Sequence, residues 1–264
     1  AIVDNPVCKG SAYLHGAHVT AFQPVGHKPV LFMSKQSAFA PGKAIRGGVP
    51  VCFPWFGPHA TDQSAPAHGP ARITEWRLQE VLERAGDVSL RFTLAIDPFA
   101  VDYLVSFGKV LTMTLTVKNT SAAPATFEAA LHTYFVVSDI KQIQITGLEG
   151  VDYLDKVDTG KRKNQGNEAI RFIGETDRVY LDTRSACVLT DPGMGRKITV
   201  EKSGSDTTVV WNPWIDKAKK MPDFGDDEWP GMACIETANA GPNAVSLAPG
   251  TTHSMNATIR VVDQ

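Results

Sequence analysis

A histidine and a glutamate, His132 and Glu236, are the side chains of this chain best placed to move protons near neutral pH. His132 lies in the strand-like segment Ala125 to Val137, where alternation places it on one face with Glu128 and Tyr134. A polar and aromatic face of this kind is consistent with the inside of a cleft. A histidine in a strand can equally be a structural residue, so the residues alone leave both interpretations open.

Glu236 ends the apolar run that begins at Met232. A carboxylate in that position is either a surface residue at the end of a strand or an acid held at the rim of a sheet. In the second case its apolar neighbours would disfavour the charged form and raise the pKa of the carboxyl group. A raised pKa suits a general base that works near neutrality.

The irregular segment Ala44 to Arg72 is rich in glycine, proline and aromatic residues. Gly47 and Gly48 allow backbone angles and close approaches that a side chain would forbid. We expect an ordered loop that presents Arg46 and Arg72 to an anion, because guanidinium groups bind phosphate oxygens in pairs. Either arginine could instead pair with an acid and hold the loop together.

The elements that must position these residues are predicted to be strands. Apolar and polar residues alternate in Val88 to Ile96, Leu111 to Val117 and Met255 to Val261, a pattern typical of antiparallel sheets. No long helical periodicity and no domain boundary interrupt it, so we expect one all-β domain over residues 1–264. Shorter candidate strands are Pro29 to Met33, Ile143 to Gly147, Ile170 to Ile173, Lys197 to Glu201 and Thr207 to Trp211. Thr159 to Asn167 and Asp216 to Trp229 are expected to be surface loops, the second with one helical turn.

Composition limits the possible partners. The 264 residues are 43% hydrophobic and carry a formal net charge of −2, which argues against nucleic acid or an anionic membrane as partner. No stretch has transmembrane length, so a monomeric cytoplasmic enzyme is the expectation. The four cysteines are far apart and lack a CxxC pair, which predicts buried free thiols.

Several motifs in order along the chain resemble the aldose 1-epimerase (galactose mutarotase) superfamily, in the branch that acts on hexose 6-phosphates. They are IRGGVPVCFPWFGP, AHGPAR, ALHTYF, TDRVY, WNPW and MACIETA. The resemblance implies a large antiparallel β-sandwich of the galactose mutarotase type, a supersandwich with little helix. Pro70 stands where that family usually has a bulky apolar residue, which affects the expected shape of the loop.

The resemblance also implies roles for particular residues. His132 would donate a proton to the sugar ring oxygen, and Glu236 would take the proton of the C1 hydroxyl. Arg46 and Arg72 would bind the phosphate of a small sugar phosphate. Anomer exchange by this acid and base requires no cofactor and no metal.

Three further residues have a binding and a structural interpretation. His68 would hydrogen-bond the sugar or support the second arginine, and Asp177 would contact the sugar or serve as a turn residue. Trp211 would line the cleft or pack in the core, and for it we favour the structural role.

Other functions remain open at the level of sequence. A carbohydrate-binding sandwich without catalysis would not need both His132 and Glu236, and a mutarotase for unphosphorylated aldoses would not need Arg46 and Arg72. A metal pair at His15 and His18 is disfavoured, because side chains that are three residues apart on a strand point to opposite faces of the sheet. The glycine pair does not have the GxGxxG spacing of a dinucleotide site.

Overall fold

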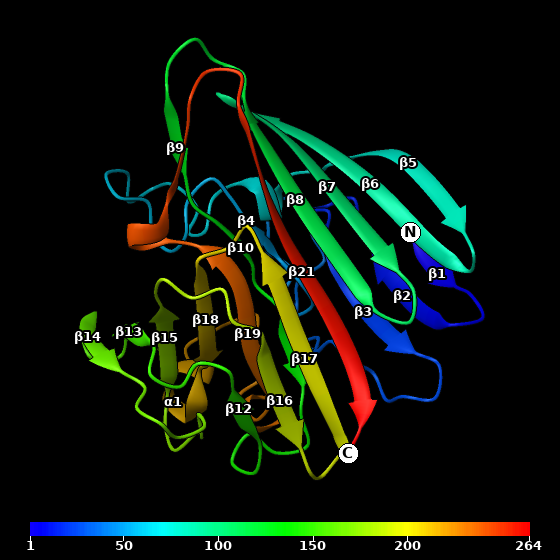
Figure 1. Cartoon of the computed structure of the whole chain (residues 1–264), viewed down its shortest axis with the longest axis vertical. Helices are drawn as coiled ribbons and strands as arrows, with labels where there is room; N and C mark the ends of the chain where they lie inside the picture. The colour runs from blue at the N-terminus through cyan, green and yellow to red at the C-terminus, as the bar shows by residue number, and fades with distance from the viewer.

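The computed structural model describes all 264 residues, and antiparallel strands dominate it (Figure 1). Two eight-stranded sheets form the body of the molecule, and a three-stranded and a two-stranded sheet complete it. The α-helical content is the single short helix α1 (Trp214–Ala218), accompanied by 3-10 turns. The all-β prediction is therefore confirmed. None of the helices combines the length and the apolar character needed to cross a membrane.

The first eight-stranded sheet, here called the long-strand sheet, contains the longest strands of the chain. Its order is β12-β16-β17-β21-β8-β7-β6-β5, and β17, β21 and β8 run side by side in Figure 1. All three alternating segments predicted from the sequence lie in it, within β6, β8 and β21. The bounds are β12 (Gln144–Thr146), β16 (Cys187–Asp191), β17 (Arg196–Ser203), β21 (Thr252–Asp263), β8 (Leu111–Asn119), β7 (Phe99–Phe107), β6 (Asp87–Ile96) and β5 (Arg77–Arg84).

The second eight-stranded sheet, here called the short-strand sheet, has the order β14-β13-β15-β18-β19-β10-β4, with β11 also paired to β19. Its central strand β19 (Met232–Asn239) is buried at every position, because both faces of the sheet are covered. The other bounds are β14 (Lys161–Asn164), β13 (Asp152–Asp155), β15 (Thr176–Tyr180), β18 (Thr207–Asn212), β10 (Ala129–Leu131), β11 (Tyr134–Val136) and β4 (Val51–Cys52).

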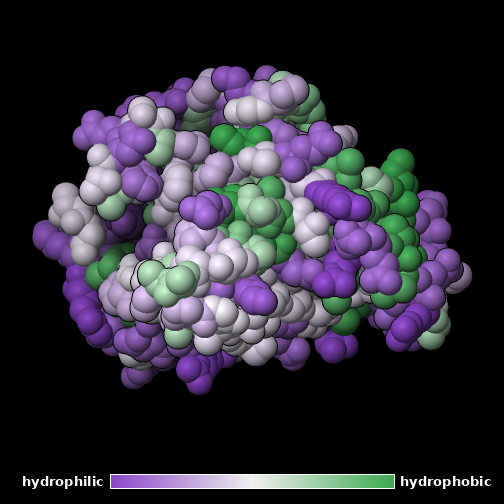
Figure 2. Space-filling view, turned by 90° about the horizontal axis from the view of Figure 1, so that it is seen from above, coloured by the Kyte–Doolittle hydropathy of each residue, from purple (hydrophilic) through white to green (hydrophobic).

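The main core is one cluster of 57 buried hydrophobic residues that includes side chains from both large sheets. The N-terminal sheet β1 (Ile2–Asp4), β2 (Cys8–Ala12) and β3 (Val19–Pro24) also contributes to it. All four cysteines are free and buried, which confirms that prediction. Large hydrophobic side chains that remain exposed, such as Ile2 and Ile173, are exceptions on a mixed surface where hydrophobic patches lie among hydrophilic residues (Figure 2).

Three predicted segments differ from the structure. Pro29 to Met33 and Ile170 to Ile173 make only isolated bridges. In the first, alternate amides bond to different elements, Val30 to Phe22 and Phe32 to Tyr134, so no ladder forms. The charged segment Thr159 to Asn167 contains edge strand β14 rather than only a loop.

The single strand predicted over Ala125 to Val137 was wrong. The segment is divided into β9 (Ala125–Phe127), β10 and β11, with His132 and Thr133 outside the strands. The chain changes sheets here, because β9 pairs with β20 (Val245–Leu247) whereas β10 and β11 pair with β19. The carboxylate of Glu128 stabilises the change by accepting from the amides of Phe56 and Gly241.

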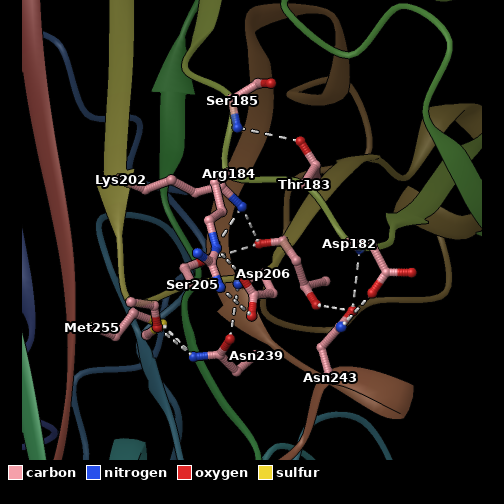
Figure 3. Close-up of polar contacts among 12 residues, drawn as sticks. Asp182, Thr183, Arg184, Ser185, Lys202, Ser205, Asp206, Asn239, Asn243 and Met255 are labelled. Carbon is pink, nitrogen blue, oxygen red and sulfur yellow. Dashed lines mark hydrogen bonds and ion pairs between the residues drawn. The ribbon is translucent and has the colours of Figure 1, made fainter.

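A polar network holds the C-terminal end of β19 to the turn between β17 and β18 (Figure 3). Asn239 Oδ1 accepts from the amide of Asp206 at 2.9 Å, and its Nδ2 donates to the carbonyl of Gly204 at 2.8 Å. The Ser205 hydroxyl donates to the carbonyl of Ala238 at 2.7 Å. These bonds fix the strand end three residues beyond Glu236.

Candidate active site

A cleft of about 410 Å³ opens over the short-strand sheet, and it contains most of the predicted site residues. Its floor comes from β15, β18 and β19, and its walls come from the loops around residues 46, 57 and 68 and from the segment after β18. The lining residues are Arg46, Phe56, Gly57, Pro58, His68, His132, Lys156, Asp177, Val209, Trp211, Lys217, Met221 and Glu236.

Strand register places His132 directly opposite Glu236. Before the histidine, Ala130 pairs with Ala238, and after it Tyr134 pairs with Cys234. The two short strands β10 and β11 therefore keep one register on β19, and the position between them falls opposite the glutamate. Directly opposed antiparallel residues share a face. His132 Nε2 accordingly lies 3.4 Å from Glu236 Oε1.

The neighbouring row of the sheet contributes Asp177 and Trp211 to the floor. Asp177 pairs with Trp211 across β15 and β18, and Trp211 pairs with Cys234 across β18 and β19. With Tyr134 opposite Cys234, these side chains form a continuous row beside the histidine and glutamate. Three of the motifs singled out in the sequence, TDRVY, WNPW and MACIETA, thus meet because they lie on neighbouring strands of the sheet, β15, β18 and β19.

Aromatic rings surround the imidazole of His132. Tyr134 stacks on it in parallel, with ring centroids 4.7 Å apart and planes 9° apart, and Trp211 meets it edge-on at 5.9 Å. The residue is 7% exposed. Burial, with smaller effects from His68 and from the charge of Arg46, holds the pKa of His132 well below its usual value.

Glu236 is even more enclosed, with 1% of its surface exposed. Neither carboxyl oxygen has a hydrogen-bond partner within the protein. Burial raises the pKa of Glu236 well above its usual value, and the charge of Asp177 adds to this effect. Burial thus favours uncharged forms of both groups. The histidine and glutamate together can hold one proton, either on the carboxyl group or on the imidazole, without changing their total charge.

Arg46 is held on two sides at the edge of the cleft. Its Nε and Nη2 donate to Asp223 Oδ2 at 3.2 and 3.1 Å, and its Nη1 donates to the Tyr134 hydroxyl at 2.9 Å. The two glycines that follow have positive φ values of 112° and 58°. A Cβ on Gly48 would lie 2.2 Å from the carbonyl oxygen of Val19. The loop therefore packs so closely against Val19 that only glycine fits at this position, as the sequence predicted.

His68 lies in the cleft wall and contacts the histidine of the floor, with ring centroids 5.9 Å apart. Its Nδ1 accepts from the amide of Gly57 at 3.2 Å, which leaves Nε2 as the protonated nitrogen of the neutral ring. Burial, together with the charges of Arg72 and Arg46, lowers the pKa of His68 to about 3. His68 therefore remains a neutral hydrogen-bond donor at physiological pH.

Arg72 does not line the cleft. Its Nη2 donates to the carbonyl of Ala67 at 2.8 Å, and its Nε is buried without a partner. The arginine thus supports the turn that carries His68. Its charge nevertheless contributes to the lowered pKa of His132.

Comparison with known proteins agrees with the motifs. A family model described as aldose 1-epimerase matches residues 3–260. The chain belongs to the aldose 1-epimerase family.

Two relatives of this epimerase share the provisional name glucose-6-phosphate 1-epimerase. The protein of Cenchrus ciliaris is 36% identical over 261 residues, which cover 92% of this chain and 78% of the relative. The protein of Escherichia coli K12 is 37% identical over 246 residues, which cover 90% and 82%. A crystal structure provisionally assigned as a mutarotase from Salmonella typhimurium superposes with a TM-score of 0.92 at 32% identity, covering 100% of this chain and 90% of that one.

The epimerase cleft also contains residues that sequence reasoning missed. Lys217 lies 2.9 Å from Glu175 and 3.6 Å from Asp177. Lys156 lies beside them through a bond from its amide to the Asp177 carbonyl. Both lysines come from segments without regular alternation. Lys217 follows closely after WNPW, which could have drawn attention to it, whereas Lys156 lies far in sequence from TDRVY and WNPW. Trp211, for which we favoured a structural role, lines the cleft while remaining 7% exposed.

Proposed function

We propose that this epimerase interconverts the α and β anomers of glucose 6-phosphate and related aldohexose 6-phosphates by acid–base ring opening. The observation that carries the proposal is the pair formed by His132 and Glu236, 3.4 Å apart at the floor of the cleft. Both oxygens of the glutamate lack a partner within the protein. A buried polar atom without a partner is costly, and a sugar hydroxyl in the cleft would supply the missing bond.

The reaction conserves the single proton of the pair. With the proton on His132, the Glu236 carboxylate takes the proton of the C1 hydroxyl and the bond from C1 to the ring oxygen breaks. The ring oxygen receives that bond pair and takes its proton from the imidazolium. The products are an open-chain aldehyde, a neutral histidine and a protonated glutamate.

Ring closure uses the same two groups in reverse. After rotation about C1–C2, the C5 hydroxyl oxygen attacks the other face of the aldehyde and gives its proton to His132. Glu236 returns its proton to the former carbonyl oxygen. Both residues end in their starting states, so each turnover inverts C1 without net proton exchange with solvent. A positioned acid or base of this kind commonly contributes about 10² to 10⁴-fold to the rate.

The phosphate is proposed to bind on the Arg46 side of the cleft. Arg46 already offers an oriented guanidinium, and its partner Asp223 is half-buried beside it. Arg72 would contribute through its positive charge and by supporting His68. The structure also offers Lys156, whose ammonium makes no ion pair, as a further cation within the same cleft.

Two-dimensional exchange NMR can test the proposal by measuring anomer interconversion of glucose 6-phosphate and of glucose under the same conditions. We expect catalysed exchange with a clear preference for the phosphorylated sugar. Equal rates with both sugars would support a mutarotase for unphosphorylated aldoses. Binding of the sugar phosphate without faster exchange would support the carbohydrate-binding alternative.

A further inference from the structure

A third potential ligand for a metal lies beside the histidine and glutamate of the cleft floor. Cys234 occupies the neighbouring row of the sheet, two residues before Glu236 on β19 and opposite Tyr134. One ligand atom from each of His132, Cys234 and Glu236 can be chosen so that all three lie within 4.8 Å of one another. An imidazole, a thiol and a carboxyl group are the ligand types that zinc uses in proteins.

The spacing of the first two ligands already fits a tetrahedral ion. Two ligand atoms, each about 2.1 Å from zinc and separated by a tetrahedral angle, lie about 3.4 Å apart. The distance between His132 Nε2 and Glu236 Oε1 is 3.4 Å. The ligand atom of Cys234 lies within 4.8 Å of the other two, so the thiol must move closer to complete a three-residue set.

The ligand atoms are also free to bind. Both carboxyl oxygens of Glu236 are buried without a hydrogen-bond partner, and the glutamate is 1% exposed. Cys234 forms no disulfide. The set therefore consists of enclosed polar groups that face one another, unlike an acidic cluster on a surface.

We propose that His132, Cys234 and Glu236 form a binding site for a zinc ion that inhibits the enzyme. Binding releases two protons to the buffer, because zinc requires a thiolate, a carboxylate and a neutral imidazole. One is the thiol proton, which is replaced by a bond between sulfur and zinc, and the other is the single proton held by His132 and Glu236. A water molecule from the cleft occupies the fourth position. The ion removes the acid and the base from the reaction together, so the inhibition rests on the proposed function whereas the binding does not.

Binding is measured directly by competition between the protein and a fluorescent zinc chelator, with zinc as the only added metal. We expect one zinc ion per chain, and no comparable binding of Mg²⁺, which prefers oxygen ligands in octahedral geometry. Loss of an outer-shell partner weakens metal affinity by roughly 10 to 100-fold. Cys234→Ala removes a direct ligand, so it should weaken zinc binding by more than this. Cys52→Ala is the matched control, because Cys52 is also a fully buried cysteine of the same sheet but lies outside the ligand set.

Activity gives a separate readout. With inhibition expressed relative to the zinc-free activity of each protein, Cys234→Ala should require at least about tenfold more zinc than the wild type for half inhibition. A chelator should restore full activity to the wild type. If the wild type binds zinc but catalyses no exchange of glucose 6-phosphate, the metal site stands and the proposed function fails.

Cobalt substitution gives a spectroscopic readout of the thiolate ligand. Co²⁺ bound through a thiolate produces a charge-transfer absorption band in the near ultraviolet, which we expect for the wild type and not for Cys234→Ala. Absence of this band, absence of zinc binding, or equal zinc affinity of the wild type and Cys234→Ala would each overturn the proposal.

Discussion

The rings of His132 and Tyr134 lie parallel, with centroids 4.7 Å apart and planes 9° apart. The hydroxyl of the same tyrosine accepts a hydrogen bond from Arg46 Nη1 at 2.9 Å. One side chain thus contacts both the proposed acid and the proposed phosphate-binding arginine. Its two contacts can be separated, because the ring makes one and the hydroxyl makes the other.

Tyr134→Phe removes only the hydroxyl contact. We expect KM for glucose 6-phosphate to rise by roughly tenfold, the worth of one charge-assisted hydrogen bond, with a smaller change in kcat because the ring still stacks on the histidine. Steady-state kinetics would measure both values. Tyr103→Phe is the control, since the hydroxyl of Tyr103 is buried without a partner. An unchanged KM in Tyr134→Phe would show that this bond does not orient Arg46 for the substrate.

Arg46→Ala should raise KM for glucose 6-phosphate by roughly 10 to 100-fold, because the phosphate does not react and its contacts are nearly equal in ground and transition states. Arg72→Ala should act in the same direction and also loosen the turn at His68. Slow exchange of unphosphorylated glucose should respond little to either change. Arg91→Ala serves as the control, because Arg91 pairs with Asp102 on the long-strand sheet. Equal responses with both sugars would contradict the assignment of the phosphate.

His18 predicts how stability depends on pH. Its buried Nε2 donates to the carbonyl of Gly47 at 2.8 Å, and burial lowers the pKa of the ring to about 3. Between that value and the unfolded pKa of about 6.5, only the unfolded chain binds the proton. The free energy of unfolding should therefore fall as pH falls below 6.5, with His18 contributing about 2 kcal/mol of this loss at pH 5.

The variant His18→Gln isolates this contribution. It should be less stable than the wild type near neutral pH, since it loses packing around the ring, but its stability should decline less steeply as the pH falls. Urea unfolding at several pH values between about 7.5 and 5 would measure the slopes. His68, with a pKa also lowered to about 3, leaves a residual slope in both proteins. Identical slopes would show that His18 is protonated in the folded state.

The sequence predicts the long-strand sheet well and the short-strand sheet less well, for a physical reason. In β6, β8 and β21 the same partners continue for many residues, so alternation persists long enough to be recognised. Around His132 the chain changes partners after every few residues, and the pattern over Ala125 to Val137 hides the break. The motifs bring His132 and Glu236 to attention, but only the register on β19 shows that they face each other.

The remaining site residues depend on tertiary contacts that no local pattern carries. Lys156 and Lys217 enter the cleft because the hairpin after β13 and helix α1 meet beside Asp177. The pairing of Arg46 with Asp223 joins residues far apart in the sequence. For the two predicted arginines, binding of the phosphate stays a prediction.

The acid–base pair is tested most directly by the rate of anomer exchange of glucose 6-phosphate in the wild type, His132→Ala, Glu236→Gln and the double variant. We predict that each single change lowers the exchange rate by about two orders of magnitude or more. The double variant should be only slightly slower than the slower single variant, since the two groups act on one proton. Circular dichroism establishes that each variant is folded. Near-normal exchange in either folded single variant would contradict the account.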